Sequence, residues 1–361
     1  MDTKFILQSL QEGEIDHERA MKEILDITGL GDEDVHVVTN WPRFPELFRL
    51  NRIVKGRHIF WLHGGVGNVQ PYLKLALTVQ RPFWGIQSKG WMSPGTSFLR
   101  GIPEMAAYYV EIIRTVQPEG PYELGGYSMG GSLAYEITKQ LQESGETVNT
   151  IVMIDTPASF DHIWCQGDYK DMLLKTVNTL LLPGAVGKQG KLEELLVHSN
   201  ELDTRSDEES FLQQLTDLAL KKGLKRKESL FKELVCQRAQ VIMAYDIHRY
   251  VLSPLPYPEN VSCYYFHNKN GLFYGDMEPY FCLATRSDKH ENNIHRNKWK
   301  ELIPDFHLIN LIAPNHIQLL YDQQSVDTIS TFCNLLYSEQ GLTMDAFRAF
   351  KTKVNIHHGG K

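Results

Sequence analysis

The chain has 361 residues, of which 42% are hydrophobic, 22% charged and 11% aromatic, and its formal net charge is −7. These are ordinary globular proportions, so a collagen-like, coiled-coil or wholly disordered protein is excluded. The acidic balance argues against nucleic acid or an anionic lipid surface as the main partner, and the lack of an apolar run of about 18 residues argues against a membrane span.

The first predicted element is a helical linker or docking extension over residues 1–45. Asp16 can cap a short helix with one apolar face, but the piece is too small to hold a core of its own. Its polar, acidic start is unlike a signal peptide, which needs a basic start and an apolar core. The five cysteines are widely spaced and include no C-x-x-C pair, so we expect reduced thiols, no zinc site and a cytoplasmic protein.

An α/β pattern follows in residues 57–157, where short apolar runs alternate with helical periods. The runs HIFWLHGG, RPFWGIQ, PYELGGY and TIVMID are typical of buried strands, and IPEMAAYYVEIIRTVQP and SLAYEITKQLQESG have helical spacing. Strands that alternate with helices over this length predict a mostly parallel central sheet with helices on both faces.

The stretch of about 158–250 has only amphipathic helical patterns. Strand patterns return afterwards in SCYYFHN and FHLINLI, before a closing helix in STFCNLLYSEQ. A helical insertion between strands of one sheet predicts a lid over the carboxyl edge of the sheet, where ligands bind in open α/β folds. We therefore assign residues 46–340 to one sheet domain with an enlarged helical lid, and treat 341–361 as a C-terminal tail.

A G-x-S-x-G pentapeptide, Gly126 to Gly130, joins the strand pattern YELG to a helical pattern. This context is the one that a nucleophile elbow requires, and it predicts Ser128 as the nucleophile. The sharp turn strains the serine backbone and needs neighbours without bulky side chains, which Gly126 and Gly130 provide, while Gly131 lets the helix approach the sheet. The alternative is a Gly-rich turn with an incidental serine.

A serine hydroxyl needs an adjacent base, and in this fold the base lies on a loop after a late strand. His316 fits this position, because it follows the strand pattern FHLINLI and a turn at 313–315. The alternative for His316 is a surface-loop histidine without a catalytic role. The other histidines considered fall in a polar stretch, in strand patterns, in the tail, or at the end of the first strand: His290, His295, His267, His307, His357, His358 and His63.

The acid that orients this imidazole has two candidate places in the fold. The strand after the nucleophile helix ends in IVMIDTP, which supplies Asp155. The next core strand ends in CYYFHNKN, which offers Asn268 and Asn270 but no carboxylate. Asp155 is therefore preferred, and Asp276 is a remote second choice. The order Ser, Asp, His along the chain is the one that α/β-hydrolases use.

An oxyanion hole needs two preorganised backbone amides. Met129, directly after the nucleophile, supplies one of them at a helix N-terminus, which favours negative charge. The Gly-rich turn at 63–67 supplies the other, and Gly65 is the predicted donor. A phosphate cradle is disfavoured, because neither G-x-x-x-x-G-K-[ST] nor G-x-G-x-x-G is present.

With these residues assembled, residues 57–335 resemble the thioesterase domains that end modular polyketide and nonribosomal peptide synthases, in the α/β-hydrolase superfamily. The likeness rests on the strand and Gly-rich turn at 59–67, on GIQ with a later glycine at 85–90, on IPEMA at 102–106, and on QPEGPYELGGYSMGGSLAYE and VMIDTP. It implies that an acyl chain passes from the phosphopantetheine thioester of an acyl carrier protein to the serine, with no metal and no protein-bound cofactor.

The resemblance leaves the acceptor open. Hydrolysis or macrolactonisation would release a polyketide-like acyl chain, whereas an acyltransferase would pass it to a hydroxyl of a polyketide or another carrier-bound chain. A stand-alone proofreading thioesterase is disfavoured, because it needs neither the long lid nor the extension. A non-catalytic domain that has kept the fold is disfavoured by the intact set of Ser128, Asp155 and His316.

Three features depart from the family pattern. The spacing from Asp155 to His316 is long and includes an extra loop at about 270–298, and Pro314-Asn315 stand where the family usually has a G-x pair. The N-terminal segment resembles short helical elements between domains of trans-acyltransferase polyketide synthases. That likeness implies docking or linkage to an upstream synthase module.

A basic run at the end of a predicted lid helix stands out in this acidic chain, and it includes Lys222, Lys225 and Arg226. Carrier proteins of this class are typically acidic, so the run predicts a docking surface that steers a carrier protein. The alternative is an ordinary solvated face.

Overall fold

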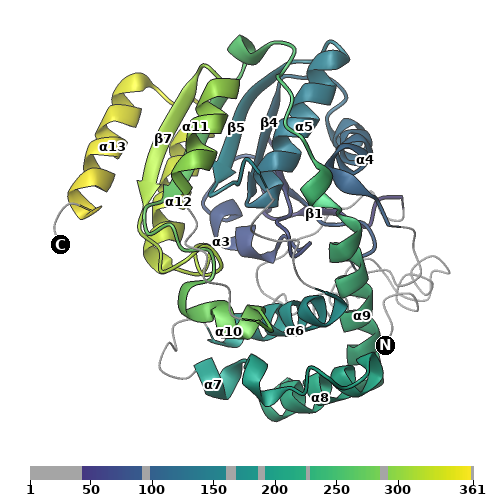
Figure 1. Ribbon diagram of the computed structural model, residues 1–361. Coiled ribbons are helices and arrows are strands. Elements are labelled where there is room, and N and C mark those ends of the chain that lie inside the picture. The colour runs from purple at the N-terminus through teal and green to yellow at the C-terminus, as the bar shows by residue number, and fades with distance from the viewer. Residues whose placement is uncertain are drawn as a thin grey trace.

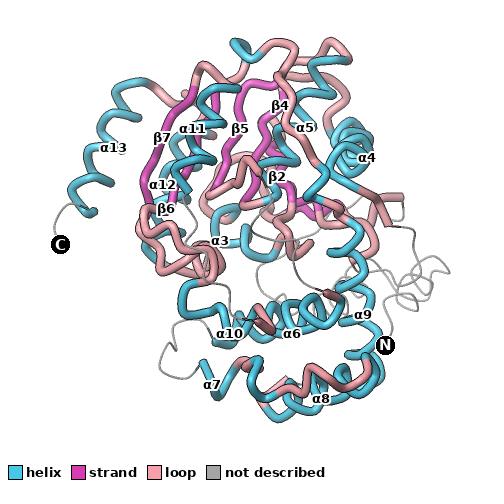
Figure 2. Tube along the Cα trace, viewed as in Figure 1, coloured by secondary structure: helices cyan, strands magenta, loops and turns pink. Residues whose placement is uncertain are grey.

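The computed structural model describes residues 43–91, 98–159, 168–185, 192–224, 228–284 and 292–358. Within them lies a seven-stranded sheet of order β1-β3-β2-β4-β5-β6-β7 (Figure 2). Neighbouring strands are parallel except β1 and β3, which are antiparallel. The predicted, mostly parallel α/β sheet is confirmed. Its strands are β1 (Leu47–Arg49), β2 (Ile59–Leu62), β3 (Phe83–Ile86), β4 (Tyr122–Tyr127), β5 (Val148–Ile154), β6 (Ser262–Asn268) and β7 (Phe306–Leu311).

Helices cover both faces of this sheet (Figure 1). Helices α4 (Gly101–Val116), α5 (Met129–Glu143) and α11 (Asn292–Leu302) lie on one face, and α3 (Leu73–Ala76) and α12 (Gln323–Leu336) lie on the other. Because neither face of the sheet meets water, β2 and β3 are buried along their whole length and read as continuous apolar runs. The sheet thus forms a rigid base that fixes the loops at its carboxyl edge.

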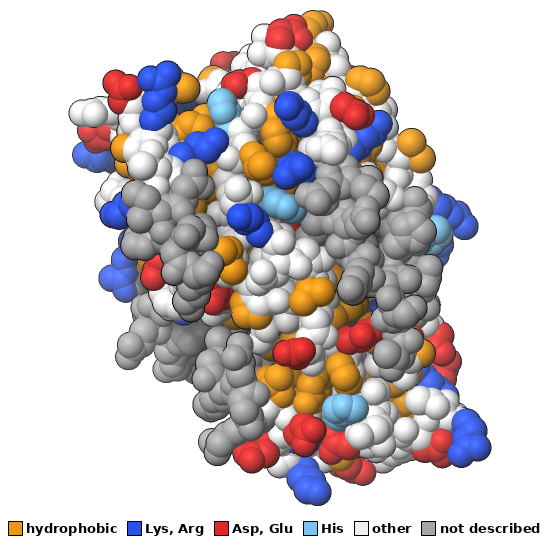
Figure 3. Space-filling view, turned by 60° about the vertical axis from the view of Figure 1, so that its left-hand side comes forward, with side chains coloured by type: hydrophobic (Ala, Val, Ile, Leu, Met, Phe, Trp, Pro, Cys, Tyr) orange, Lys and Arg blue, Asp and Glu red, His pale blue; other side chains and the backbone are white. Residues whose placement is uncertain are grey.

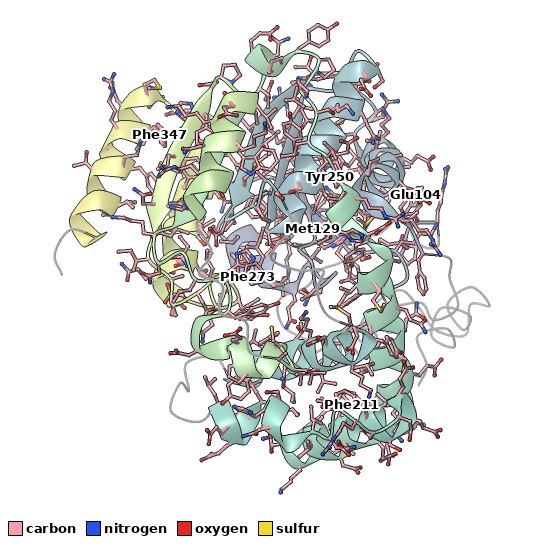
Figure 4. The ribbon with its side chains drawn as sticks, in the orientation of Figure 1. Glu104, Met129, Phe211, Tyr250, Phe273 and Phe347 are labelled. Atoms are coloured by element: carbon pink, nitrogen blue, oxygen red, sulfur yellow. The ribbon has the colours of Figure 1, made fainter. Side chains whose placement is uncertain are left out.

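The predicted lid consists of helices that lie beyond the carboxyl edge of the sheet (Figure 1). They are α6 (Tyr169–Ala185), α7 (Leu192–Leu195), α8 (Glu208–Lys221) and α9 (Glu228–Ala244). Helix α6 packs against α8 and α9, and the described part of this insertion contains no strand. The apolar face of α8 buries Phe211 and Leu215 inside the lid (Figure 4).

The segment at about 270–298, expected to be an extra loop, contains helical structure. Helix α10 (Glu278–Phe281) packs against α6 and so extends the lid, and α11 begins at Asn292 and packs against β6. Most residues around α11 are polar, but Trp299 attaches the helix to the sheet. Its side chain is fully buried, and its indole N–H donates to the Thr156 carbonyl oxygen at 2.9 Å.

The segment 341–361, treated above as a tail, contains helix α13 (Met344–His358). Phe347, Phe350 and Val354 repeat at spacings of three and four, so they share one helix face, and all three are buried. Phe347 packs edge-on against Tyr264 of β6, with ring centroids 5.8 Å apart. The tail is therefore part of the folded domain.

Two further points concern the start of the domain. The three-residue edge strand β1 was not predicted, because it is too short to show a period in the sequence. Residues 1–42, which hold most of the predicted linker or docking extension, lie outside the described residues.

Candidate active site

Ser128 lies in the turn between β4 and α5 in a backbone conformation that non-glycine residues rarely adopt. Its φ is 56° and its ψ is −127°. The turn puts the serine at the carboxyl edge of β4 and directly before the first residue of α5. This is the geometry that a nucleophile elbow requires.

The glycines of this turn leave no room for a side chain. A Cβ atom at Gly126 would lie 2.3 Å from the carbonyl carbon of Gly130, and one at Gly130 would lie 2.3 Å from the carbonyl oxygen of Leu62. A Cβ atom at Gly131 would lie 2.0 Å from Oγ1 of Thr156. Backbone contacts this close explain why the elbow needs glycine on both sides of the serine.

Three buried side chains from separate loops meet beside this turn. Nε2 of His316 lies 2.9 Å from Oγ of Ser128, and Nδ1 of the same ring lies 2.8 Å from Oδ2 of Asp155. All three residues are at most 7% exposed. With a neutral imidazole, the serine hydroxyl donates to Nε2 and the Nδ1 proton is donated to the carboxylate. Such a chain can remove the proton of the serine hydroxyl.

Asp155 follows β5 directly, and its own backbone is left-handed with φ at 45°. Its backbone N–H donates to the carbonyl of Phe266 at 2.7 Å, and its Oδ1 accepts from the N–H of Asn268 at 3.3 Å. These contacts with β6 fix the carboxylate relative to the sheet. The second choice for the acid, Asp276, is exposed on a short helical turn and has no such position.

Asn268, the last residue of β6, and Asn270, two residues later, have a role that the sequence analysis missed. Oδ1 of Asn268 accepts from the N–H of Ala313 at 3.1 Å, and Nδ2 of Asn270 donates to the carbonyl of Ala313 at 2.7 Å. Both side chains therefore hold the start of the loop that carries His316. The signal that could have revealed this role is that both asparagines stand at the end of β6, which neighbours β5, the strand before Asp155.

The imidazole of His316 lies between two aromatic rings. Tyr127 stacks on one side with ring centroids 4.7 Å apart, and Phe273 stacks on the other at 4.3 Å. The Tyr127 hydroxyl also donates to the backbone carbonyl of His316, and burial raises the pKa of this hydroxyl well above its ordinary value, so it stays protonated. The His316 N–H donates to the Leu272 carbonyl at 2.8 Å. Ring rotation is thus restricted from both sides.

His63, the histidine at the end of the first predicted strand, has partners other than the serine. Nε2 of His63 lies 2.7 Å from the hydroxyl of Tyr109 and its Nδ1 lies 2.7 Å from the Gly64 carbonyl oxygen, so both ring nitrogens are engaged beside the Gly-rich turn. Burial lowers the pKa of His63 to about 4, and the ring is therefore neutral near pH 7. His267 and His307 lie in β6 and β7, and His290 lies outside the described residues.

A pocket opens in front of Ser128 and His316 between the sheet edge and the lid. The Gly-rich turn lines it with Gly64 and Gly65, and α6 and α10 close the far side. Most of the remaining wall is apolar, as in sites that hold hydrophobic ligands. Figure 4 shows Met129 and Phe273 at the boundary between the sheet layer and the lid.

The two predicted oxyanion donors both lie beside Ser128. Met129 is the first residue of α5 and is buried, and Gly65 lines the pocket together with Ser128. Backbone amides at a helix N-terminus and in a glycine turn are groups that can stabilise a negatively charged substrate oxygen.

Lys222, predicted to help dock a carrier protein, has partners inside the lid. Nζ of Lys222 lies 3.1 Å from a carboxylate oxygen of Glu201 and donates to the carbonyl of Glu193 at 2.6 Å, and its side chain is 8% exposed. Lys222 therefore joins the end of α8 to the lid residues Glu193 and Glu201. On the face that Figure 3 shows, acidic side chains gather over the lower, lid part. Lys225 and Arg226 lie outside the described residues.

Two kinds of feature are absent from the described residues. No group of three or more His, Cys, Asp or Glu side chains there could hold a metal ion. In the same part of the chain, every helix is too short or too polar to cross a membrane.

The chain is similar to parts of two curated synthases. It is 39% identical over 335 residues to polyketide synthase PksR of Bacillus subtilis, which covers 92% of this chain and 13% of PksR. It is also 39% identical over 101 residues to atromentin synthetase of Tapinella panuoides, across 27% of this chain and 10% of that protein. The chain thus spans only a small part of the length of the relatives that it matches.

Solved structures show the same fold at low sequence identity. The four-domain nonribosomal peptide synthetase holo-AB3403 superposes with a TM-score of 0.59 at 21% identity, over 87% of this chain and 21% of that one. The Vlm2 thioesterase domain superposes with a TM-score of 0.51 at 17% identity, over 82% of this chain and 98% of that one.

A family model decides the membership. The model described as "Thioesterase domain" matches residues 57–335, which include β2 to β7, the lid and the loops that carry the three candidate site residues. The chain therefore belongs to the thioesterase domain family and has its α/β-hydrolase fold.

Proposed function

We propose that this chain is a chain-releasing thioesterase domain of a polyketide synthase. It takes an acyl chain from the phosphopantetheine thioester of an acyl carrier protein and releases it through an acyl-enzyme on Ser128. The observation that carries this proposal is the hydrogen-bonded series of Ser128, His316 and Asp155 at the end of an apolar pocket.

In the acylation step, Oγ of Ser128 attacks the thioester carbonyl carbon while Nε2 of His316 accepts the hydroxyl proton. Asp155 stabilises the imidazolium through Nδ1. The tetrahedral intermediate then collapses, the carbon–sulfur bond breaks, and the imidazolium gives its proton to the departing thiolate. The products are the serine ester and the free thiol of the carrier.

The negative charge of both tetrahedral intermediates is assigned to the backbone N–H groups of Met129 and Gly65. This assignment is supported by the position of Met129 at the start of α5 and by that of Gly65 in the pocket wall beside Ser128. An amide that is already held in place needs no reorganisation during the reaction.

In the release step, an acceptor loses its proton to His316 as it attacks the ester carbonyl carbon. The carbon–oxygen bond to Ser128 breaks, and the proton returns to the serine oxygen. Water as acceptor gives an acid, and a hydroxyl of the chain itself gives a macrolactone. A hydroxyl of a second chain would make the domain an acyltransferase.

The partner is proposed to be a carrier domain of an upstream synthase module. The support is the likeness to PksR, which extends over 92% of this chain but only 13% of PksR. A domain of this size within a long synthase receives its substrate from a neighbouring domain.

Intact-protein mass spectrometry tests the acyl-enzyme. Wild type incubated with an acyl N-acetylcysteamine thioester should gain the mass of the acyl group, and Ser128→Ala should not. Ser132→Ala is the matched control, because Ser132 lies on α5 and its Oγ donates to the Pro157 carbonyl at 3.3 Å instead of contacting His316. An adduct on Ser128→Ala, or none on wild type, would contradict the proposal. Product analysis then identifies the acceptor.

A further inference from the structure

One fully buried side chain fixes a carbonyl group of the Gly-rich turn. Nδ1 of His63 lies 2.7 Å from the carbonyl oxygen of Gly64, and the side chain belongs to the core below the turn. The N–H of Gly67 donates to the same oxygen at 3.0 Å. The carbonyl of Gly64 is thus held by two donors, one from a side chain and one from the backbone.

The contacts of His63 determine which ring nitrogen carries the proton. A carbonyl oxygen can only accept a hydrogen bond, so Nδ1 beside the Gly64 carbonyl is protonated. Nε2 of the neutral ring then accepts from the hydroxyl of Tyr109 on α4 at 2.7 Å. Burial raises the pKa of this hydroxyl well above its ordinary value, so it keeps the proton that it donates. The ring is therefore held in one tautomer and one orientation.

The carbonyl of Gly64 and the N–H of Gly65 belong to one peptide group. This peptide bond is trans, and a trans peptide is planar, with its C=O and its N–H pointing in opposite directions. A donor that fixes the carbonyl therefore also fixes the direction of the N–H. The Gly65 N–H points away from the His63 ring, and Gly65 lines the pocket beside Ser128.

Glycine at position 64 lets this peptide lie directly against the nucleophile turn. A Cβ atom added there would lie 3.3 Å from the carbonyl oxygen of Tyr127 and 3.9 Å from Cβ of Ser128. Two consecutive glycines, however, have no side chain that limits the rotation of the peptide between them. The peptide needs contacts from outside to keep one orientation, and the imidazole of His63 supplies one of them.

We infer that His63 is a positioning residue for the oxyanion hole: its Nδ1–H holds the Gly64 carbonyl so that the Gly65 N–H points at the oxygen of the tetrahedral intermediate. The inference rests on the proposed function, since it concerns an amide assigned there to this oxygen. His63 acts through the peptide group and does not itself line the pocket.

Two variants separate this role from packing. Asparagine places the N–H of its carboxamide at the position of Nδ1, so His63→Asn still donates to Gly64 although its side chain is smaller. Glutamine carries its amide one carbon further, at the position of Nε2, so His63→Gln keeps more of the side-chain volume but loses this donor. Steady-state kinetics with an acyl N-acetylcysteamine thioester give kcat and KM for wild type and both variants.

His63→Gln should lower kcat by about tenfold or more and change KM by less than about twofold, because an oxyanion donor acts in the transition state. His63→Asn should keep kcat within about threefold of wild type. Both half-reactions pass through a tetrahedral intermediate, so kcat reports the loss whichever step is slower. A role in packing alone predicts the opposite order, because asparagine leaves the larger cavity.

Asn51→Leu is the matched control. Asn51 is buried like His63, and its carboxamide also holds backbone carbonyls, which belong to Ala76, Val79 and Arg81. These contacts lie before β3, at the sheet edge opposite the one that carries Ser128. The variant should be less stable than wild type in urea unfolding but keep the wild-type kcat.

A wild-type kcat in His63→Gln, or an equal or larger loss in His63→Asn than in His63→Gln, would overturn the inference. Where His63→Gln does not fold, His63→Leu takes its place with the same expected loss, because leucine has the branched shape of asparagine but no N–H. Failure of the proposed function is a different result, because wild type would then acquire no acyl group on Ser128.

Discussion

The sheet edge and the lid form opposite walls of one pocket, but they are built in different ways. At the sheet edge, backbone geometry decides: Ser128 and Asp155 both have positive φ, and the glycines at 126 and 130 touch backbone atoms. In the lid, the wall is one face of the helix α6, and its character depends on exchangeable side chains such as Lys175. The rigid wall thus carries the predicted catalytic residues, whereas the character of the α6 wall can change by substitution of side chains alone.

The largest effect is expected at the rigid wall. Asp155→Asn should keep the contact to His316 but favour the wrong imidazole tautomer, and it should lower kcat by about 10⁴-fold. The KM for a small thioester should change little, because Asp155 is not a lining residue of the pocket. Steady-state kinetics with circular dichroism of the variant measure both, and near wild-type kcat in a folded variant would remove Asp155 from the mechanism.

A second change tests whether space or backbone strain makes glycine necessary at the elbow. Gly130→Ala should destabilise the fold by about 3 kcal/mol or more, because its Cβ atom would lie 2.3 Å from the Leu62 carbonyl oxygen. Gly145→Ala is the control, since its φ is +84° but no atom lies within 4 Å of an added Cβ, and it should cost about 1 kcal/mol. Equal losses in urea unfolding would refute the steric argument.

A third prediction concerns His63, whose ring packs at a tilt against that of Tyr245, just beyond the lid helix α9, with centroids 5.6 Å apart. Burial lowers its pKa from 6.5 to about 4, so the unfolded chain binds the proton between these values and the folded chain does not. Stability should therefore fall as the pH drops through this window, by up to about 3 kcal/mol.

The measurement compares urea unfolding of wild type and His63→Gln at about pH 7 and about pH 4. The variant cannot titrate at this position. Its loss of stability between about pH 7 and about pH 4 should therefore be smaller than that of wild type by up to about 3 kcal/mol. Parallel losses in the two proteins would show that His63 is not buried as a neutral ring.

The smallest effect is expected in the lid interior. Lys222→Met removes the contacts with Glu201 and Glu193 and should cost about 1 kcal/mol of stability. Its kcat/KM should stay at the wild-type value for a carrier-bound acyl chain and for a small thioester alike, because the ammonium of Lys222 already contacts Glu201 and Glu193 within the lid. A selective loss with the carrier-bound chain would restore Lys222 as a docking residue.

Much of the rigid wall could be predicted from sequence, because its signals are local. A pentapeptide between a strand and a helix indicated Ser128, and the ends of particular strands indicated Asp155 and His316. The structure places these three side chains within hydrogen-bond distance, and their catalytic roles stay predictions.

The variable wall could not be predicted in the same way. The amphipathic pattern of α6 does not say which residues turn toward the sheet, so Lys175 was not singled out. The aromatic rings around His316 are contributed by residues 127 and 273, and only the tertiary fold brings them together. The lid partners of Lys222 were missed for a related reason, since a charge run reveals nothing about partners elsewhere in the chain.

The chain segment between β6 and α11 joins the two walls. Phe273 packs on the imidazole of His316, and eight residues later Phe281 contributes to the lid side of the pocket. A substitution that shifts α10 is therefore expected to disturb the packing around the imidazole as well as the lid side of the pocket.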